Sequence, residues 1–527
     1  MNSATIAISW NRSPSTQHVW FSEKSLCLWR QTLSSVAMKR RRGKRVADKV
    51  DDEPESQQLG ASFADLPTHI TTDILLRLPV KSILICKSVC TSWKALISDP
   101  HFAKSHFEHG PTGFTIRTRH WDGDSRILHL IESEPEIFEN DDYGQFCYCK
   151  QDFIKPECNC HLKLERKLKL PLHGAKLVLD KRDVNGKRGR QRNHISCKPE
   201  IDRFDVVNSC NGLLCLSDRD SDYIVVCNPV TGEFIRLPEA TTRIVKTRDM
   251  WLHEIYMGFG FQPKTNEYKV VRILKRFWGW QEKRNVVVEI HTLGASRWRN
   301  VGVDLDPRYL TFPRFPTCVS GALHWFMKLS ILCFNFESER FQSFPSPPIL
   351  FKEHSMGNIT MGELKGSLYI CDSSSSSHGH TRIKMWIMKK YGFGESWTKV
   401  LNIDTIRTDR WPYGQYFPVK YFKNDAAILM FHSCYTLRHR FIYYEPEKNK
   451  FKKFKVLGIG TQSTFEVIPH IHNLISLKDA VNSDNIKVMN VHARSAELKL
   501  REESEVIFLA KVKERLVNLH ISSDDEE

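Results

Sequence analysis

The chain has 527 residues, of which 41% are hydrophobic and 26% charged, so it can bury a sizeable core. No run of about 18 or more apolar residues marks a membrane span, and the odd number of cysteines, 15, favours a reducing compartment over a disulfide framework. The formal net charge of +16 would suit nucleic acid or an acidic partner, but much of it lies in residues 39–45 and 181–192.

Residues 1–60 are predicted to form a disordered leader. The first 37 residues are rich in Ser and Thr and hold one acidic residue, Glu23, which is typical of an organelle transit peptide. A gene-model extension ahead of Met38 is the alternative. Residues 39–45, KRRRGKR, form either a nuclear-import type of cluster or a solvated run of charge. We expect the protein in the nucleus and the cytoplasm, and the processing of the leader stays open.

Three short helices are predicted within residues 62–107. Apolar side chains recur at helical spacing over residues 66–78, and Pro67 falls in the first turn, where a backbone N–H has no helical partner. Pro79 begins a second helix for the same reason. A third helix is expected to stop at Asp99-Pro100. Pro79 is therefore a corner between two helices and not a break within one.

This helical unit carries more large apolar side chains than its own interior can hold. About 40 residues bury little surface and are marginally stable alone. The side chains that cannot all point inward are Leu66, Leu75, Leu76, Leu78 and Val80. Such a surplus predicts either a surface for a partner protein or packing against the rest of the same chain. The residues alone leave both alternatives open.

The apolar pattern of residues 66–102 resembles an F-box of the plant type, with Leu66-Pro67, Leu78-Pro79-Val80 and Trp93 at motif positions. The resemblance implies docking on the Skp-type adaptor of a cullin-based ubiquitin ligase. It implies an adaptor-facing surface made of Leu66, Pro67, Ile70, Leu75, Leu78, Pro79, Val80 and Ile83. It also implies an F-box core made of Val89, Trp93, Leu96 and Ile97. The departures from the family pattern are Ile85, Cys86 and Thr91.

One pattern recurs between residues 110 and 480: an apolar strand, a turn with Asn, Asp or Pro, and then an aromatic residue. The two clearest copies, 225–238 and 331–345, align Asn228 with Asn335 and Pro238 with Pro345. With three weaker copies, the marker aromatics are Phe234, Trp298, Phe341, Trp397 and Phe451. A second element, a glycine followed by alternating apolar residues, begins at Gly212, Gly321 and Gly366.

Strand pairs that repeat every 40–60 residues or so predict a β-propeller, with an irregular sandwich as the competitor. Short phrases such as SCNGLLCL and VCNPVTGEFIRLP also resemble the F-box-associated, kelch-like domain of plant F-box proteins, over residues 205–480. The predicted fold is multidomain α + β, a three-helix F-box followed by an all-β, propeller-like domain. Residues 110–204 are assigned to the start of the β domain, with a Cys-rich and a basic insertion, and residues 481–527 to a C-terminal helix and acidic tail.

The Cys-rich and basic insertions within residues 110–204 contain few candidates for a metal or nucleic-acid site. The cysteines at 147, 149, 158 and 160 could hold zinc, but their C-x-C pairs are tighter than the usual structural spacing, and a surface hairpin is the alternative. We therefore assign no metal. The basic segment 181–192 lacks the aromatic residues that stack on bases, so we do not expect nucleic acid as a partner. No Asp, Glu or His recurs at an equivalent place in the copies, so no catalytic residue or cofactor is assigned.

The two resemblances imply a substrate-receptor subunit of a Skp-cullin-F-box ubiquitin ligase. Its F-box would dock on the Skp-type adaptor and, through it, on a cullin, while the β domain would bind an unidentified protein to be ubiquitinated. The chain itself would be a non-catalytic adaptor, with no membrane partner. The alternatives are a nuclear nucleic-acid-binding protein, or a propeller that acts as a binding module or enzyme without a ligase role.

Overall fold

The computed structural model describes residues 66–109 and, with gaps at several connections, residues 113–491. The longest gaps are 132–160, 181–193, 303–315 and 348–358. The leader 1–60, the four clustered cysteines, the basic segment 181–192 and the expected helix at 495–520 lie outside the described residues. Within the described part of the chain, no helix combines the length and the apolar character needed to cross a bilayer.

Four helices come first in the described chain: α2 (Thr68–Leu76), α3 (Val80–Cys86), α4 (Thr91–Ile97) and α5 (Pro100–His109). Pro67 and Pro79, both with extended ψ angles, immediately precede α2 and α3, so the predicted corner at Pro79 is confirmed. Asp99-Pro100 ends α4 but also begins a fourth helix that the sequence analysis did not expect. The Asp99 carboxylate accepts a hydrogen bond from the His101 N–H at 2.7 Å, and Pro100 takes the first helical position.

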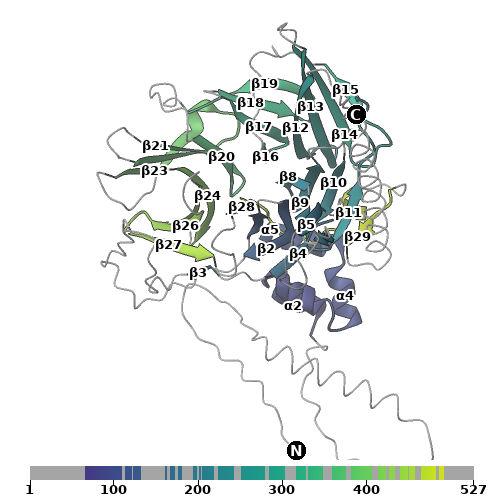
Figure 1. Cartoon of the computed structure of the whole chain (residues 1–527). Helices are drawn as coiled ribbons and strands as arrows, with labels where there is room; N and C mark the ends of the chain where they lie inside the picture. The colour runs from purple at the N-terminus through teal and green to yellow at the C-terminus, as the bar shows by residue number, and fades with distance from the viewer. Residues whose placement is uncertain are drawn as a thin grey trace, which may run out of the picture.

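Six antiparallel sheets follow and stand around one axis as the blades of a β-propeller (Figure 1). Blade 1 comprises β28 (Thr464–Ile468), β1 (Phe114–His120), β2 (Gly123–Ile131), β4 (Arg166–Lys169) and the short β7 (Ile201–Asp202). Blade 2 comprises β8 (Phe204–Cys210), β9 (Leu213–Asp218), β10 (Ile224–Asn228), β11 (Glu233–Arg236) and β29 (Met489–Asn490). Blade 3 comprises β12 (Trp251–Gln262), β13 (Glu267–Trp278), β14 (Arg284–Thr292) and β15 (Arg299–Val301).

The other three blades are built in the same strand order. Blade 4 comprises β16 (Thr317–Val319), β17 (Ala322–Met327), β18 (Ser330–Asn335) and β19 (Arg340–Phe344). Blade 5 comprises β20 (Ile359–Leu364), β21 (Ser367–Ser375), β22 (Thr381–Met388) and β23 (Trp397–Thr405), with the 3-10 turn η3 (Gly394–Ser396). Blade 6 comprises β24 (Gln415–Phe422), β25 (Ala427–Ser433), β26 (Arg440–Glu445), β27 (Lys450–Val456) and the parallel β3 (His161–Leu162). A hairpin of β5 (Lys176–Asp180) and β6 (His194–Lys198) and the helix α6 (Leu477–Val481) complete the described elements.

The ring is closed by a strand from the far end of the domain. β28 pairs antiparallel with β1, and the Thr115 hydroxyl donates to the Ile468 carbonyl at 3.3 Å. Closure excludes the sandwich alternative and sets the number of blades at six, which the sequence left open. It also places residues 114–131, which the sequence analysis assigned to the start of the β domain, in the first blade of the propeller.

The recurrent glycine element corresponds to a recurrent turn between the first two strands of a blade. Asn211-Gly212, Ser320-Gly321 and Lys365-Gly366 have φ angles of 48° and 82°, 51° and 74°, and 54° and 75°. Two consecutive residues with positive φ define a type I′ turn, whose twist matches a tight hairpin, and glycine adopts such angles without strain. The glycine pattern thus identified the inner hairpins of blades 2, 4 and 5.

The aligned asparagines and prolines also occupy equivalent places. The side-chain carbonyls of Asn228 and Asn335 each accept hydrogen bonds from the backbone N–H groups two and three residues ahead, which fixes the outer turns of blades 2 and 4. The Pro238 carbonyl accepts a hydrogen bond from the indole of Trp298 at 2.8 Å, and the Pro345 carbonyl accepts one from Trp397 at 3.0 Å. Two of the marker aromatics therefore connect one blade to the preceding blade.

Candidate functional site: the F-box surface and the propeller face beside it

The F-box helices and blades 1 and 2 share one hydrophobic cluster. The helices contribute Leu75, Leu78, Val80, Ile83, Cys86, Ile97, Phe102 and Ala103. Among the partners on the propeller are Leu128, Leu130, Leu168, Leu170, Phe204 and Val230. Each large apolar side chain buried in this way contributes about 1.5–3 kcal/mol. The helical unit is therefore stabilised by the propeller and held in one place against the ring (Figure 1).

The eight residues predicted to face an adaptor divide into two groups. Leu75, Leu78, Val80 and Ile83 are buried inside the shared cluster. Pro67, Ile70 and Pro79 are exposed, and Leu66 is half-buried. Packing against the same chain, one of the two alternatives left open, thus accounts for the buried group. Only the residues of the exposed group can contact an adaptor directly in this structure. Adaptor binding by all eight residues stays a prediction.

Helix α2 explains this division, because its apolar residues lie on two faces. Thr71 and Leu75 are buried toward the interior, whereas Ile70, four residues before Ile74, keeps 40% of its surface exposed. Ile70 and Ile74 lie four residues apart in α2 and so share its outward side, and the half-buried Leu66 lies just before the helix. Ile74 was not among the predicted site residues, although its spacing from Ile70 would have identified it. We call Leu66, Ile70 and Ile74 the α2 outer face.

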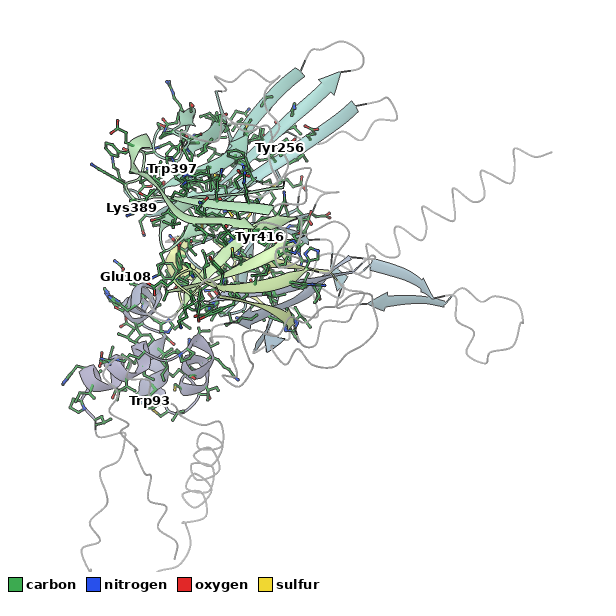
Figure 2. The ribbon with its side chains drawn as sticks, turned by 90° about the vertical axis from the view of Figure 1, so that its left-hand side faces the viewer. Trp93, Glu108, Tyr256, Lys389, Trp397 and Tyr416 are labelled. Carbon is green, nitrogen blue, oxygen red and sulfur yellow. The ribbon has the colours of Figure 1, made fainter. Side chains whose placement is uncertain are left out.

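The residues predicted to form the F-box core lie at different depths. Ile97 is buried in the shared cluster, and Trp93 and Leu96 are half-buried against it. Val89 is half-buried and is not a member of the cluster. In Figure 2, Trp93 lies on the part of the helical unit that is farther from the blades, while Glu108 of α5 lies close to them.

A buried histidine joins the last F-box helix to the corner at Pro79. His106 of α5 is buried, and its Nε2 lies 3.0 Å from the Leu78 carbonyl oxygen, so the neutral ring donates a hydrogen bond to it. Burial lowers the pKa of His106, while the hydrogen bond to Leu78 acts weakly in the opposite direction. Sequence reasoning missed this residue because a histidine in a polar helix gives no signal of burial.

The F-box attaches on the side of the ring that carries the inner hairpin turns. Helix α5 leads into β1, whose first residues pair with the last residues of β28. Figure 2 shows Glu108, Lys389 and Trp397 toward one side of the propeller and Tyr256 toward the other. A segment bound to the turns of blade 5 would consequently lie on the same side as the F-box.

A cavity of about 390 Å³ opens on this side between blades 5 and 6. Its walls are mainly apolar and include Met385, Ile387, Leu401 and Ile428. The ammonium of Lys365 lies 5.8 Å from the centre of the Tyr421 ring, and both side chains line the cavity. The cavity could take an apolar side chain of a bound segment, with one positive charge beside it. Across the described residues, no group of three His, Cys, Asp or Glu side chains is placed to hold a metal ion.

A short helical unit joined through one core to a six-bladed propeller is the architecture of an F-box protein, and comparison with known families agrees. Residues 63–105 match the F-box domain. Residues 179–481, more than half of the chain, match the F-box associated beta propeller domain, and the chain belongs to that family. The matched region leaves out β1, β2 and β4 of the first blade.

Similar proteins come from Arabidopsis thaliana. The F-box protein At3g07870 is 27% identical over 467 residues, which cover 81% of this chain and 95% of that protein. The F-box/kelch-repeat protein At3g23880 is 25% identical over 348 residues, or 64% of this chain and 79% of that protein. The resemblance to plant F-box proteins, inferred from motifs, is thereby confirmed.

Proposed function

We propose that this protein is the substrate-receptor subunit of a Skp-cullin-F-box ubiquitin ligase. F-box domains generally bind Skp-type adaptors, and this chain carries such a domain at residues 63–105. The observation that supports the proposal most strongly is the hydrophobic cluster shared by the F-box and blades 1 and 2. A receptor must hold its substrate at a fixed place relative to the transfer machinery, and a continuous core does so better than a flexible linker.

In this proposal the chain does no chemistry of its own. The F-box docks on the adaptor and thereby on the cullin, and the propeller binds the protein to be modified. Both are then held in one assembly, so substrate lysines reach a high effective concentration near the ubiquitin donor. Propeller loops on a rigid frame suit such recognition, because they can vary without loss of the core.

The adaptor contact can be tested on the α2 outer face. Ile70→Asp places a charge on a side chain that is 40% exposed, so the fold should be retained. We expect purified Ile70→Asp to bind a Skp-type adaptor at least about tenfold more weakly than the wild-type chain, a loss of about 1.4 kcal/mol. Affinity is measured by calorimetry or a quantitative pull-down.

The matched control is Val400→Asp, since Val400 on β23 is also 40% exposed and lies in blade 5. This variant should bind the adaptor as well as the wild-type chain does. Leu78→Ala is a poorer probe, because Leu78 is only 7% exposed and its truncation would disturb the shared cluster. A folded wild-type chain that fails to bind any Skp-type adaptor would refute the receptor proposal.

We further propose that the protein is present in both nucleus and cytoplasm, with import directed by the basic residues 39–45. A fluorescent fusion of the full chain should show signal in both compartments. Replacement of the six Lys and Arg residues in 39–45 by Ala should lower the nuclear fraction. An unchanged distribution would mean that the basic residues do not direct import.

A further inference from the structure

Two thiols from different blades meet beside the propeller axis. The Sγ atoms of Cys210 and Cys318 are 3.4 Å apart. Cys210 ends β8 in blade 2 and Cys318 lies in β16 of blade 4, and these two strands contact one another although blade 3 stands between them in the chain. Each is the innermost strand of its blade, at the end of its sheet.

The electrostatic surroundings make the two sulfurs unequal. With the Cys210 thiol as donor, the hydrogen bond between the two sulfurs lowers the pKa of Cys318 and raises that of Cys210. Burial raises the pKa of both thiols, and a hydrogen bond from the Phe261 backbone lowers that of Cys318. The Glu363 carboxylate acts in the opposite direction on Cys318, but its effect is the smallest. The pKa of Cys318 is therefore the lower of the two.

Cys318 also differs from other described cysteines in its accessibility. Its side chain is half-buried, whereas Cys215, Cys227 and Cys371 are fully buried, and burial raises the pKa of each of those three thiols. A thiol that is partly exposed and has a lowered pKa is the type that reacts with peroxides. A second thiol at 3.4 Å is placed to complete a disulfide, which needs an S–S distance of about 2.05 Å.

We propose that Cys210 and Cys318 form a redox site in which a hydroperoxide joins blade 2 covalently to blade 4. The Cys318 thiolate attacks one peroxide oxygen and the O–O bond breaks, which gives a sulfenic acid and, after protonation, one water from hydrogen peroxide. The Cys210 sulfur then attacks the sulfenic sulfur, so the S–S bond forms, the S–O bond breaks and a second water leaves. Two thiols lose two protons and two electrons, and the peroxide is reduced to two waters.

The disulfide would change the ring on the side where the F-box attaches. Cys210 and Cys318 stand just before the inner turns Asn211-Gly212 and Ser320-Gly321. The bond would close a loop that spans 108 residues and contains blade 3. Oxidation would thus replace a thiol contact between blades 2 and 4 by a covalent bond, and a thiol reductant would restore the dithiol. This inference does not depend on the receptor function.

The test is chemical mapping on the folded full chain. The protein is exposed to hydrogen peroxide, free thiols are blocked with N-ethylmaleimide, and the digest is analysed by mass spectrometry without reductant. We expect a peptide pair joined through Cys210 and Cys318, lighter by two hydrogen atoms than its parts and lost on reduction. We also expect the melting temperature of the oxidised chain to rise by a few degrees, because a closed loop constrains the unfolded chain.

Two variants give matched controls. Cys90→Ser removes an exposed cysteine and should leave the cross-link intact. Cys210→Ser should abolish it and leave a sulfenic acid on Cys318 that dimedone traps. The mapping of the wild-type chain stands by itself if Cys210→Ser fails to fold. The proposal is overturned if dimedone labels Cys318 stably in the wild-type chain, or if the cross-link appears only in denaturant.

Discussion

Blade 1 and blade 4 have the same sheet architecture but are assembled differently. Blade 4 is contiguous, because its four strands follow one another from Thr317 to Phe344. Blade 1 takes its innermost strand, β28, from near the end of the domain. The paired residues Thr115 and Ile468 are 353 residues apart in the chain. A contiguous blade can form from local contacts, whereas blade 1 forms only when the ring closes. Damage to blade 1 should therefore affect the whole propeller.

The strongest test of this difference is Phe465→Ala in β28. Phe465 is buried and its ring lies 5.4 Å from that of Phe431 and 5.8 Å from that of Phe441. We expect a loss of about 3–5 kcal/mol in the free energy of unfolding, measured in urea. Hydrogen exchange should become faster in both β1 and β28. Phe334→Ala in blade 4 should cost a similar free energy with faster exchange confined to its neighbours; equal patterns would contradict the comparison.

The ion pair across the closure should be the next most costly to remove. The Arg117 side chain of β1 is fully buried, donates to the Ser125 carbonyl at 2.7 Å and lies 3.6 Å from the Glu466 carboxylate of β28. Glu466→Ala removes a carboxylate that pairs with this buried guanidinium and should cost about 3 kcal/mol. Glu337→Ala removes an exposed pair with Lys264 beside blade 4 and should cost under about 1 kcal/mol. Chemical denaturation of both variants tests the ranking.

Acid should weaken both regions, because each contains a buried neutral histidine. Burial lowers the pKa of His470, just after β28, and of His324, in β17, to about 4 in each case. The unfolded chain binds these protons below pH 6.5 or so, so stability falls as the pH drops from there toward about 4. Each residue should remove about 2 kcal/mol by pH 5. Urea midpoints from pH 7 to 5 test this, and His470→Gln should flatten the decline; a flat wild-type profile would refute it.

Smaller effects are expected at the tryptophan contacts between successive blades. Trp298→Phe and Trp397→Phe each remove one indole N–H that donates to a proline carbonyl of the preceding blade. The lost hydrogen bond should cost each variant about 1 kcal/mol, and the smaller phenyl ring adds a packing loss at each buried site. Since the two contacts are equivalent and lie in different blades, the double variant should lose the sum. Thermal and urea unfolding measure the losses. Strongly unequal losses for the two variants would mean that the two contacts do not contribute equally to stability.

The sequence predicted the parts of the propeller that depend on neighbouring residues. Type I′ turns need glycine, and outer turns such as those of Asn228 and Asn335 need a side chain that accepts backbone hydrogen bonds, so both leave residue types at fixed spacing. The strand pairing that closes blade 1 gives no such pattern of residue types in the sequence. The pairing of Arg117 with Glu466 depends on the register of two distant strands, and neither residue is unusual within its own segment.

For the F-box, too, the sequence predicted local features but not contacts with distant parts of the chain. Its motif and its corner at Pro79 were evident from residue spacing. The burial of Val80 and Ile83 was not, because it depends on blades 1 and 2, which cover those side chains. Helix α5 was missed because Asp99-Pro100 both ends one helix and begins the next. The thiol pair Cys210–Cys318 likewise depends on two strands that meet only in the closed ring.

The position of β28 also affects how the protein is made. At about 5–20 residues per second, a ribosome needs roughly 20–70 s to synthesise the 353 residues between Thr115 and Ile468. During that time the edge of β1 that β28 will cover has no strand to pair with, and an unpaired edge attracts other strands. The F-box helices emerge first and lack their propeller cover for part of this interval. Yield in cells should therefore depend on chaperones that shield nascent chains, and slower translation of the later blades should lower it.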